Sequence, residues 1–355
     1  MRRILVMRLD NIGDVLMTGP ALRAIKAALP HTHLTLMASP AGSQAAALLP
    51  WVDAVLTWRV LWQDMGSLPF DPAREWHLIE TLRAGQFDAA IIFTSFSQSP
   101  HPAAVVCKLA DIPLCIGQSK ETAGALLDIE LAAPPDELHQ VERNLRLVEA
   151  LGCPVDDRSL TISIPEAARQ SLASKRWTYG ITPDAPYAVL NPWTSCAART
   201  YNSSRFAKAA RLLGAATGLP VVVVGTEKDR EQSAALLEAI GSTAFDMVGQ
   251  TTLPELAALI DEAQLLLTNN TATMHIADAT RTPQVVLFAG TELAVQWQPR
   301  HTPTRLLTRP TWCSPCYLFT CPYQQECLDI SPATVMAAAS ALLGNGTSPH
   351  LRGIS

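Results

Sequence analysis

Residues 220–240, PVVVVGTEKDREQSAALLEAI, join a short apolar run, a polar turn and a stretch with helical spacing of apolar residues. The run Val221–Val224 contains no alternating polar residue, which is typical of a parallel strand covered on both faces. From Asp229 to Ile240 the apolar residues recur as they do on one side of a helix. The segment therefore predicts a strand, a turn and a helix, the repeating unit of a doubly wound α/β domain.

The same alternation of short apolar runs and amphipathic stretches continues through most of the chain, so the predicted fold class is α/β with parallel sheets. The expected strands are Ile4–Leu9, Leu34–Ala38, Ala89–Phe93, Pro113–Ile116, Tyr187–Asn191, Pro220–Val224, Leu265–Thr268 and Gln284–Phe288. The expected helices are Ala21–Leu29, Glu75–Ala84, Phe206–Ala216, Asp229–Ile240, Leu253–Asp261, Met274–Ala279 and Ala333–Leu343.

The chain has 355 residues, which suits two domains at roughly 100–200 residues each. A polar, proline-bounded stretch at 164–184 is the expected linker. We expect a first domain at 1–168, a second at 169–331, and a closing helix with a frayed tail at 332–355. In open α/β sheets, ligands bind at the carboxyl ends of strands, so the loops that follow the strands are where a site is expected.

Composition excludes several classes of protein. The chain is 48% hydrophobic and 17% charged with a formal net charge of −5, which excludes collagen, coiled coil and bulk disorder and argues against a general nucleic-acid binder. No apolar run approaches the roughly 20 residues that span a bilayer. Arg8 and Asp10 interrupt the apolar N-terminal stretch too early for a signal peptide, so a cytoplasmic location is expected.

The first loop with candidate chemistry is residues 8–15, RLDNIGDV, which follows the first expected strand. Asp14 stands where the next helix begins. It can serve simply as a capping or first-turn carboxylate, or it can project into a cleft and accept a proton. No G-x-G-x-x-G or Walker A pattern occurs in the chain, so the loop is not a dinucleotide fingerprint.

A second candidate loop is residues 268–275, TNNTATMH, which joins a buried strand to a helix. Small and hydroxyl-bearing residues at such a junction leave backbone N–H groups available to an anion, and the helix dipole favours one there. His275 on the first turn can donate to a phosphate oxygen. The alternative is an ordinary capped helix with His275 as a hydrogen-bonded packing residue.

These two loops, in this order, resemble those of glycosyltransferase family 9, the ADP-heptose:lipopolysaccharide heptosyltransferases. The family pattern is a strand, R-x-x-x-I-G-D-[VL] and then T-x-P-A-L-R-A-[LI]-K, which corresponds here to Arg8–Asp14 and Thr18–Lys26. The second family motif, [ST]-N-[DN]-[ST]-G-x-x-H-[LI]-A-x-A-x-x-[TR]-P, corresponds to Thr268–Pro283. The resemblance covers nearly the whole chain.

The resemblance implies a GT-B architecture, in which two Rossmann-like domains face a cleft, and inverting transfer from a nucleotide-sugar without an organic cofactor. The N-terminal domain would bind a lipopolysaccharide-core or other envelope-glycan acceptor at the inner-membrane surface, and the C-terminal domain would bind the donor, ADP-heptose. Asp14 would be the general base. The alternatives are a protein acceptor, a nucleotide-sugar epimerase or hydrolase of GT-B type, and an inactive binding protein of this fold.

The family's donor site can be carried over residue by residue. Arg199 stands where members usually have lysine. Asp229 is the best match for the acid that contacts ribose, and Glu227 is the alternative. Asn270 and Ala272 replace the aspartate and glycine of the family's D-[TS]-G motif. The donor residues implied by the resemblance are Gly13, Thr194, Ser195, Arg199, Asp229, Asn270, Thr271, Ala272, Thr273 and His275.

Four cysteines crowd into residues 313–327. Their spacing, C-x2-C-x4-C-x5-C, can satisfy a tetrahedral thiolate site for a structural zinc or iron. The alternative is a set of reduced thiols that pack a surface loop or form disulfides on oxidation. A similar cluster occurs in many family members, and a cysteine motif holds iron in the related autotransporter heptosyltransferases. The candidate metal ligands are Cys313, Cys316, Cys321 and Cys327.

Tryptophans also gather in the N-terminal half, with two arginines nearby. Such side chains usually pack a core or a domain surface. The alternative is a platform for an acceptor or a membrane interface, since tryptophan has an apolar body and a polar tip. The residues concerned are Trp51, Trp58, Trp62 and Trp76.

Overall fold

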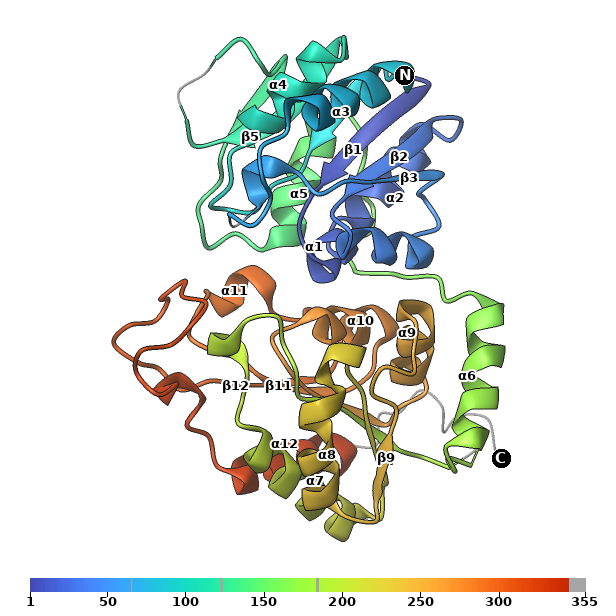
Figure 1. Cartoon of the computed structure of the whole chain (residues 1–355), viewed down its shortest axis with the longest axis vertical. Coiled ribbons are helices and arrows are strands. Elements are labelled where there is room, and N and C mark those ends of the chain that lie inside the picture. The colour runs from blue at the N-terminus through green and yellow to red at the C-terminus, as the bar shows by residue number, and fades with distance from the viewer. Residues whose placement is uncertain (65, 122–123, 183–184, 345–355) are drawn as a thin grey trace. The chain divides into compact units, whose positions relative to one another are not determined.

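The computed structural model describes residues 1–64, 66–121, 124–182 and 185–344. The chain divides into two compact units, Met1–Ser163 and a second that begins at Ile164 (Figure 1). Each unit is built around one parallel sheet with helices packed against it. The prediction of two doubly wound α/β units is confirmed.

The first unit contains a six-stranded parallel sheet in the order β3-β2-β1-β4-β5-β6. The order reverses between β1 and β4, which pair with Leu5 opposite Ala90. The strands are β1 (Arg3–Arg8), β2 (His33–Ala38), β3 (Ala54–Thr57), β4 (Ala89–Ile92), β5 (Leu114–Ser119) and β6 (Ile129–Ala132). The helices are α1 (Ile12–Leu16), α2 (Gly19–Ala28), α3 (Pro72–Ala84), α4 (His101–Leu109) and α5 (Gln140–Glu149), with 3-10 turns η1 (Gly42–Leu48) and η2 (Leu61–Gln63).

The second unit repeats this topology in the order β12-β11-β10-β7-β8-β9, with the reversal between β7 and β10. The strands are β7 (Ala188–Asn191), β8 (Val221–Val223), β9 (Ala244–Asp246), β10 (Leu265–Asn269), β11 (Gln284–Leu287) and β12 (Thr304–Leu307). The helices are α6 (Glu166–Thr178), α7 (Ser203–Thr217), α8 (Arg230–Ile240), α9 (Leu253–Asp261), α10 (Ala272–Thr280), α11 (Ala294–Trp297) and α12 (Pro332–Gly344), with 3-10 turns η3 (Ala197–Arg199), η4 (Glu227–Asp229) and η5 (Glu326–Leu328).

The inner strands are the ones that the sequence predicts, within one to three residues at their ends. They are buried along almost their whole length, as the valines of β8 and the leucines of β10 illustrate. The edge strands β3, β6, β9 and β12 were not predicted. Their side chains are only partly buried, so they contain no continuous apolar run to mark them.

The prediction that residues 164–184 form a linker is wrong, because α6 occupies residues 166–178. The compact units divide between Ser163 and Ile164, so the expected boundary at 168 falls inside this helix. α6 buries Leu172 and its Lys175 forms an ion pair with Glu255 of α9, which attaches the helix to the second unit.

The closing helix is not a separate segment. α12 places Val335, Ala339 and Leu342 in the hydrophobic core of the second unit, beside α7. The frayed tail that we expected, at 345–355, lies outside the described residues.

Candidate active site

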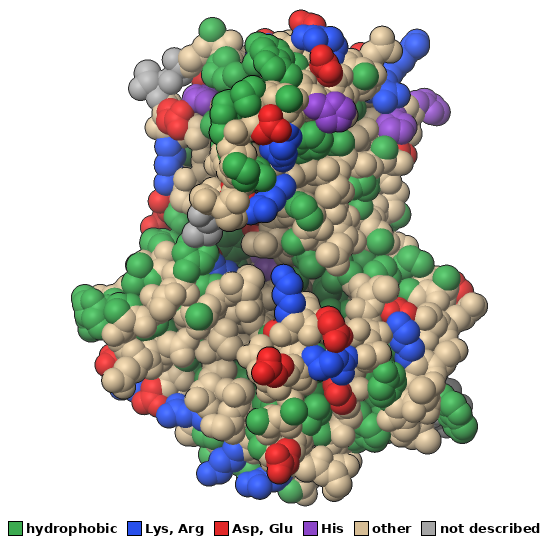
Figure 2. All heavy atoms as spheres, in the orientation of Figure 1, with side chains coloured by type: hydrophobic (Ala, Val, Ile, Leu, Met, Phe, Trp, Pro, Cys, Tyr) green, Lys and Arg blue, Asp and Glu red, His purple; other side chains and the backbone are tan. Residues whose placement is uncertain are grey.

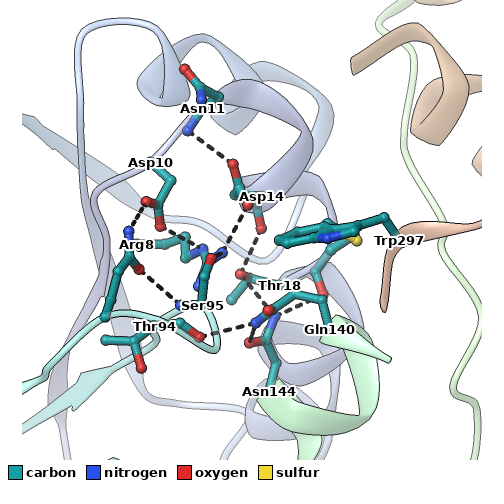
Figure 3. A network of polar contacts seen from close by, with 12 residues as sticks. Arg8, Asp10, Asn11, Asp14, Thr18, Thr94, Ser95, Gln140, Asn144 and Trp297 are labelled. Carbon is teal, nitrogen blue, oxygen red and sulfur yellow. Dashed lines mark hydrogen bonds and ion pairs between the residues drawn. The ribbon is translucent and has the colours of Figure 1, made fainter. Parts of the chain in front are cut away.

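Asp14 lies in the first turn of α1, directly after the carboxyl end of β1 (Figure 3). Its Oδ2 accepts the backbone N–H of Asn11 at 3.1 Å, so the carboxylate does serve as a cap. Its Oδ1 accepts a hydrogen bond of 2.9 Å from Arg8 Nη2. The side chain remains 15% exposed, so it is not sealed from solvent or a ligand. The capping reading of Asp14 is therefore confirmed, and its use as a base remains a prediction.

Arg8 is the last residue of β1, and its side chain is fully buried. Nη2 donates to Ser95 Oγ at 2.8 Å as well as to Asp14, and Nε lies 3.1 Å from Asp10 Oδ2. Ser95 belongs to the loop after β4, the neighbour of β1 at the point where the strand order reverses. Such reversal points form the ligand crevices of doubly wound sheets.

Asp10, which Figure 3 shows beside Arg8, and Gln98 complete this group. Gln98 Nε2 donates to Asp10 Oδ1, and Gln98 Oε1 accepts the backbone N–H of Ser95 at 2.8 Å. Burial raises the pKa of Asp10; the Arg8 charge opposes this shift and the Asp14 charge adds to it. One arginine therefore faces two carboxylates, and the three charges act together.

A chain of hydrogen bonds holds α1 in place behind Asp14. Thr18 Oγ1 donates to the backbone oxygen of Asp14 at 3.0 Å, and Asn144 of α5 donates to Thr18 Oγ1 at 3.3 Å. Gln140 donates to Asn144 Oδ1 at 2.8 Å and to the backbone oxygen of Thr94 at 3.1 Å. These side chains are buried and mutually bonded, so α1 is tied to α5 and to the end of β4.

The second unit has its own polar group at the reversal point between β7 and β10. Arg199 Nη2 donates to Glu292 Oε1 at 2.7 Å, and Asn270 Nδ2 donates to Glu292 Oε2 at 2.9 Å. Glu292 was not among the predicted residues, because nothing in its local sequence distinguishes it from a surface glutamate. It lies on the loop after β11 and joins two residues that the sequence did single out.

The start of α10 contains four more of the predicted donor residues. Thr271 is the N-cap residue with an extended backbone, and its side chain makes no capping bond. The first turn of any helix presents N–H groups with no intrahelical acceptor, which suits an anion. Thr273 and His275 are buried, and Thr273 Oγ1 bonds Thr268 Oγ1 at 2.8 Å. The Thr273 hydroxyl therefore holds the junction between β10 and α10 through a buried hydrogen bond. Ala272 is partly exposed.

The hydroxyl of Thr194 organises the turn after β7. It donates to the backbone oxygen of Cys196 at 2.6 Å and lies 2.8 Å from Thr200 Oγ1. Ser195 is exposed. Asn269 binds this turn from β10, since its amide donates to the backbone oxygen of Pro192 at 2.8 Å. Hydrogen bonds from Thr194 and Asn269 thus hold the turn, and the Ser195 side chain is exposed on it.

Asp229 caps its own turn after β8. Its Oδ2 accepts the backbone N–H of Thr226 at 2.8 Å and the Thr226 hydroxyl at 2.7 Å. A side chain at Gly225 would collide with the Trp193 ring, at 2.5 Å from its nearest atom, so glycine is required where this turn passes Trp193. Gly13 is buried within α1 of the first unit. Contact of Asp229 or Gly13 with a donor stays a prediction.

The cysteine loop packs beside Arg199. Ala198 donates its backbone N–H to Phe319 O at 2.9 Å, and Gln325 Nε2 donates to Ala197 O at 2.6 Å. Three thiols are half-buried and Cys327 is buried, and all are free. As they stand, no three or more His, Cys, Asp or Glu side chains within the described ranges could hold a metal ion.

The tryptophans of the first unit mostly pack. Trp58 and Trp62 lie partly buried against its core, and the Arg74 guanidinium lies 4.9 Å from the centre of the Trp58 ring. Trp76 is 56% exposed. No helix among the described residues is both long enough and apolar enough to cross a bilayer. On the face drawn in Figure 2, basic side chains are dispersed among acidic ones.

Comparison with known proteins identifies the family. The model of glycosyltransferase family 9 (heptosyltransferase) matches residues 75–326, and this chain belongs to that family. Lipopolysaccharide heptosyltransferase 3 of Escherichia coli is 24% identical over 294 residues, which are 81% of this chain and 83% of that protein. The chain is therefore a glycosyltransferase, as the motifs indicated.

Solved structures agree on the fold. A family 9 glycosyltransferase from Veillonella parvula superposes with a TM-score of 0.78 at 20% identity, covering 97% of this chain and 98% of that one. The Escherichia coli ADP-heptose lipopolysaccharide heptosyltransferase II gives 0.76 at 21% identity, covering 97% and 99%. The two Rossmann-like units of this chain are those of a GT-B glycosyltransferase.

Proposed function

We propose that this glycosyltransferase transfers a heptose from ADP-heptose, with inversion, to the lipopolysaccharide core or a related envelope glycan. The observation that carries the proposal is the partly exposed Asp14 carboxylate, held at the strand-order reversal of the first sheet by the buried Arg8. The sugar and nucleotide are suggested by the names of the Escherichia coli relatives.

Asp14 acts as the general base in this proposal. Its carboxylate takes the proton of the acceptor hydroxyl while that oxygen forms a bond to the anomeric carbon. The bond from that carbon to the diphosphate oxygen breaks at the same time, and the pair of electrons leaves with ADP. Charge develops on the sugar ring in an oxocarbenium-like transition state, by analogy with glycoside cleavage. One base on the acceptor side is sufficient for inversion.

The departing diphosphate requires positive charge and N–H donors. Arg199 supplies a guanidinium, whose planar fork suits phosphate oxygens, and the start of α10 supplies backbone N–H groups. Ser195 is exposed on the turn after β7, and the Thr194 hydroxyl binds the backbone of that turn. Glu292 orients Arg199 and Asn270 before the donor arrives. Preorganised charge of this kind stabilises the leaving group without further rearrangement.

We also propose that the acceptor is bound by the first unit and that the enzyme works in the cytoplasm, peripherally at the inner membrane. The support is the name of the Escherichia coli relative, a lipopolysaccharide heptosyltransferase, because a lipopolysaccharide acceptor is confined to a membrane surface. Among the four clustered tryptophans of the first unit, the exposed Trp76 is the one that could meet such a surface.

The cysteine loop is proposed to hold a structural zinc or iron. Cys313, Cys316, Cys321 and Cys327 all line one cavity of about 10 Å³. Cys321 Sγ accepts the backbone N–H groups of Tyr323 and Gln325, each at 3.3 Å, so two backbone groups hold this sulfur in the loop. Since the side chains as they stand could not hold an ion, the thiols would have to converge when the metal binds. With four protein ligands the role is structural.

Product analysis tests the proposed function. The purified protein is incubated with ADP-heptose and with lipopolysaccharide-core acceptors that lack heptose, and the products are resolved by mass spectrometry. A glycan extended by one heptose supports the proposal if the anomeric configuration of the new linkage is opposite to that of the donor. Free heptose indicates a hydrolase, an altered nucleotide-sugar indicates an epimerase, and binding without turnover on any acceptor indicates an inactive protein of this fold. Transfer to a polypeptide alone would replace the glycan acceptor with a protein.

A further inference from the structure

The first unit buries one guanidinium against two carboxylates, and the proposed mechanism uses only one of them. Arg8 Nη2 bonds Asp14 at 2.9 Å, and Arg8 Nε lies 3.1 Å from Asp10. The Arg8 side chain is fully buried, whereas the carboxylates are 13% and 15% exposed. The group therefore carries a net negative charge when both carboxylates are ionised, in a place where solvent screens it poorly.

We propose that Asp10 is a positioning residue that makes Asp14 a stronger base and keeps Arg8 neutralised once Asp14 has taken up the acceptor proton. This inference rests on the proposed role of Asp14. Asp10 touches neither the acceptor nor the donor in this scheme, and it acts only through the charge and the orientation of Arg8.

The reason is the charge balance of proton transfer. With a single Arg–Asp pair, protonation of the aspartate would leave a buried arginine without a counter-charge, which is costly. With two aspartates, the transfer changes the group from one excess negative charge to none, and Arg8 stays paired with Asp10. Burial and the Asp14 charge raise the pKa of Asp10, while Arg8 and Gln98 oppose the rise. Once Asp14 is protonated, its charge no longer raises the pKa of Asp10, which favours the ionised Asp10 that stays paired with Arg8.

The surroundings add few other charges. The loop after β4 contributes the neutral Ser95 and Gln98, and η1 contains no titratable side chain. The Ser39 hydroxyl bonds the backbone oxygen of Asp10 at 2.5 Å. Arg143 of α5 is a further cation nearby. Burial lowers the pKa of Arg143, and the Arg8 charge lowers it further by a smaller amount. A cation favours ionised carboxylates, so Arg143 makes Asp14 a weaker base, whereas Asp10 makes it a stronger one.

Gln98 links Asp10 to the rest of the fold. Its amide donates to Asp10 and accepts the backbone N–H of Ser95, whose hydroxyl accepts from Arg8. The loop after β4 thus fixes Asp10 and Arg8 together. Loss of the Gln98 amide would weaken the ionised form of Asp10 and loosen its hold on Arg8, which gives a second way to disturb the same balance.

The test is the pH dependence of kcat/KM for wild type, Asp10→Asn, Asp10→Glu and Gln98→Leu. In Asp10→Asn, Arg8 has Asp14 as its only carboxylate partner, which favours ionised Asp14. We therefore expect the acid limb of the kcat/KM profile to move to lower pH by about one unit. We expect kcat to fall about tenfold, with ADP affinity unchanged. Asp10→Glu should restore most of the wild-type acid limb and most of kcat. Gln98→Leu should shift the acid limb to lower pH by less than Asp10→Asn does.

A second measurement needs no substrate. Carbon-13 NMR of protein labelled at the aspartate carboxyl carbons follows the titration of Asp14 directly, with Asp14→Asn to assign its signal. We expect that titration to move to lower pH in Asp10→Asn. An Asp14 titration and an acid limb that both stay unchanged in Asp10→Asn would overturn the inference while leaving Asp14 as the base. Full activity of Asp14→Asn would instead remove the proposed function on which it rests.

Discussion

The guanidinium of Arg199 lies 2.7 Å from the carboxylate of Glu292, which stands on the loop after a different strand of the same sheet. The same carboxylate accepts the amide of Asn270 at 2.9 Å. Arg199 is therefore held by one nitrogen, and its Nε is buried without a hydrogen-bond partner among the described residues. A buried donor of this kind favours a ligand that can accept from it.

Arg199→Ala is expected to weaken ADP binding by about 1.5–3 kcal/mol, the usual contribution of a hydrogen bond to a charged group. Calorimetric titration of ADP into each variant measures this. Arg205→Ala is the matched control, because Arg205 pairs with Asp329 at the surface of the same unit. Equal ADP affinity in Arg199→Ala and wild type would place the diphosphate elsewhere.

Asp14→Asn is expected to lower turnover by about 10²–10⁴ while ADP affinity stays close to wild type, since the amide cannot take up the acceptor proton. Steady-state kinetics with saturating donor and acceptor give the loss, and thermal unfolding verifies that α1 survives without the Arg8 ion pair. Asp157→Asn removes an exposed carboxylate, paired with Arg23, from the same unit and should leave turnover unchanged. Normal turnover in Asp14→Asn would assign the base to another residue.

Cys316→Ser is expected to lose metal and to melt at a lower temperature, because metal-binding free energy becomes folding free energy when the site forms only in the folded chain. Elemental analysis of wild type purified without chelators should show about one zinc or iron per chain. The loop bonds the turn of Arg199 through Gln325, so ADP affinity should fall as well. Cys153→Ser, at a buried cysteine of the first unit, is the control for metal content. A wild-type preparation of full stability without metal would leave these cysteines as packing residues.

Glu255 makes the stability of the second unit depend on pH. Burial alone would raise the pKa of Glu255, but hydrogen bonds from Lys175, Ser171 and Thr252 outweigh it and lower the pKa from 4.5 to about 2. Ionised Glu255 therefore adds about 2–3 kcal/mol above pH 4.5, and this is lost as pH falls towards 2. Urea unfolding of wild type and Glu255→Gln between pH 3 and 7 measures it. The difference between them should shrink as pH falls, and a constant difference would contradict the assignment.

The sequence by itself determined the central part of each sheet. Runs such as Val221–Val224 are buried on both faces in the structure, and that burial is why they contain no polar alternation. The edge strands lack this signal, since β3 and β12 have alternating or partial burial that also suits a loop. The glycine and carboxylate after β1, and the hydroxyl-rich start of α10, were visible because turn and cap chemistry is local.

Only the tertiary structure decided which side chains meet. Asp10 and Gln98 come from loops after β1 and β4, and Arg199 and Glu292 from loops after β7 and β11. No local pattern relates such pairs, because their contact depends on parallel strands placing their carboxyl ends at one edge of the sheet. The linker was misassigned for the same reason. Residues 166–178 read as polar in sequence, and they form a helix because Lys175 and Leu172 gain partners on the second unit.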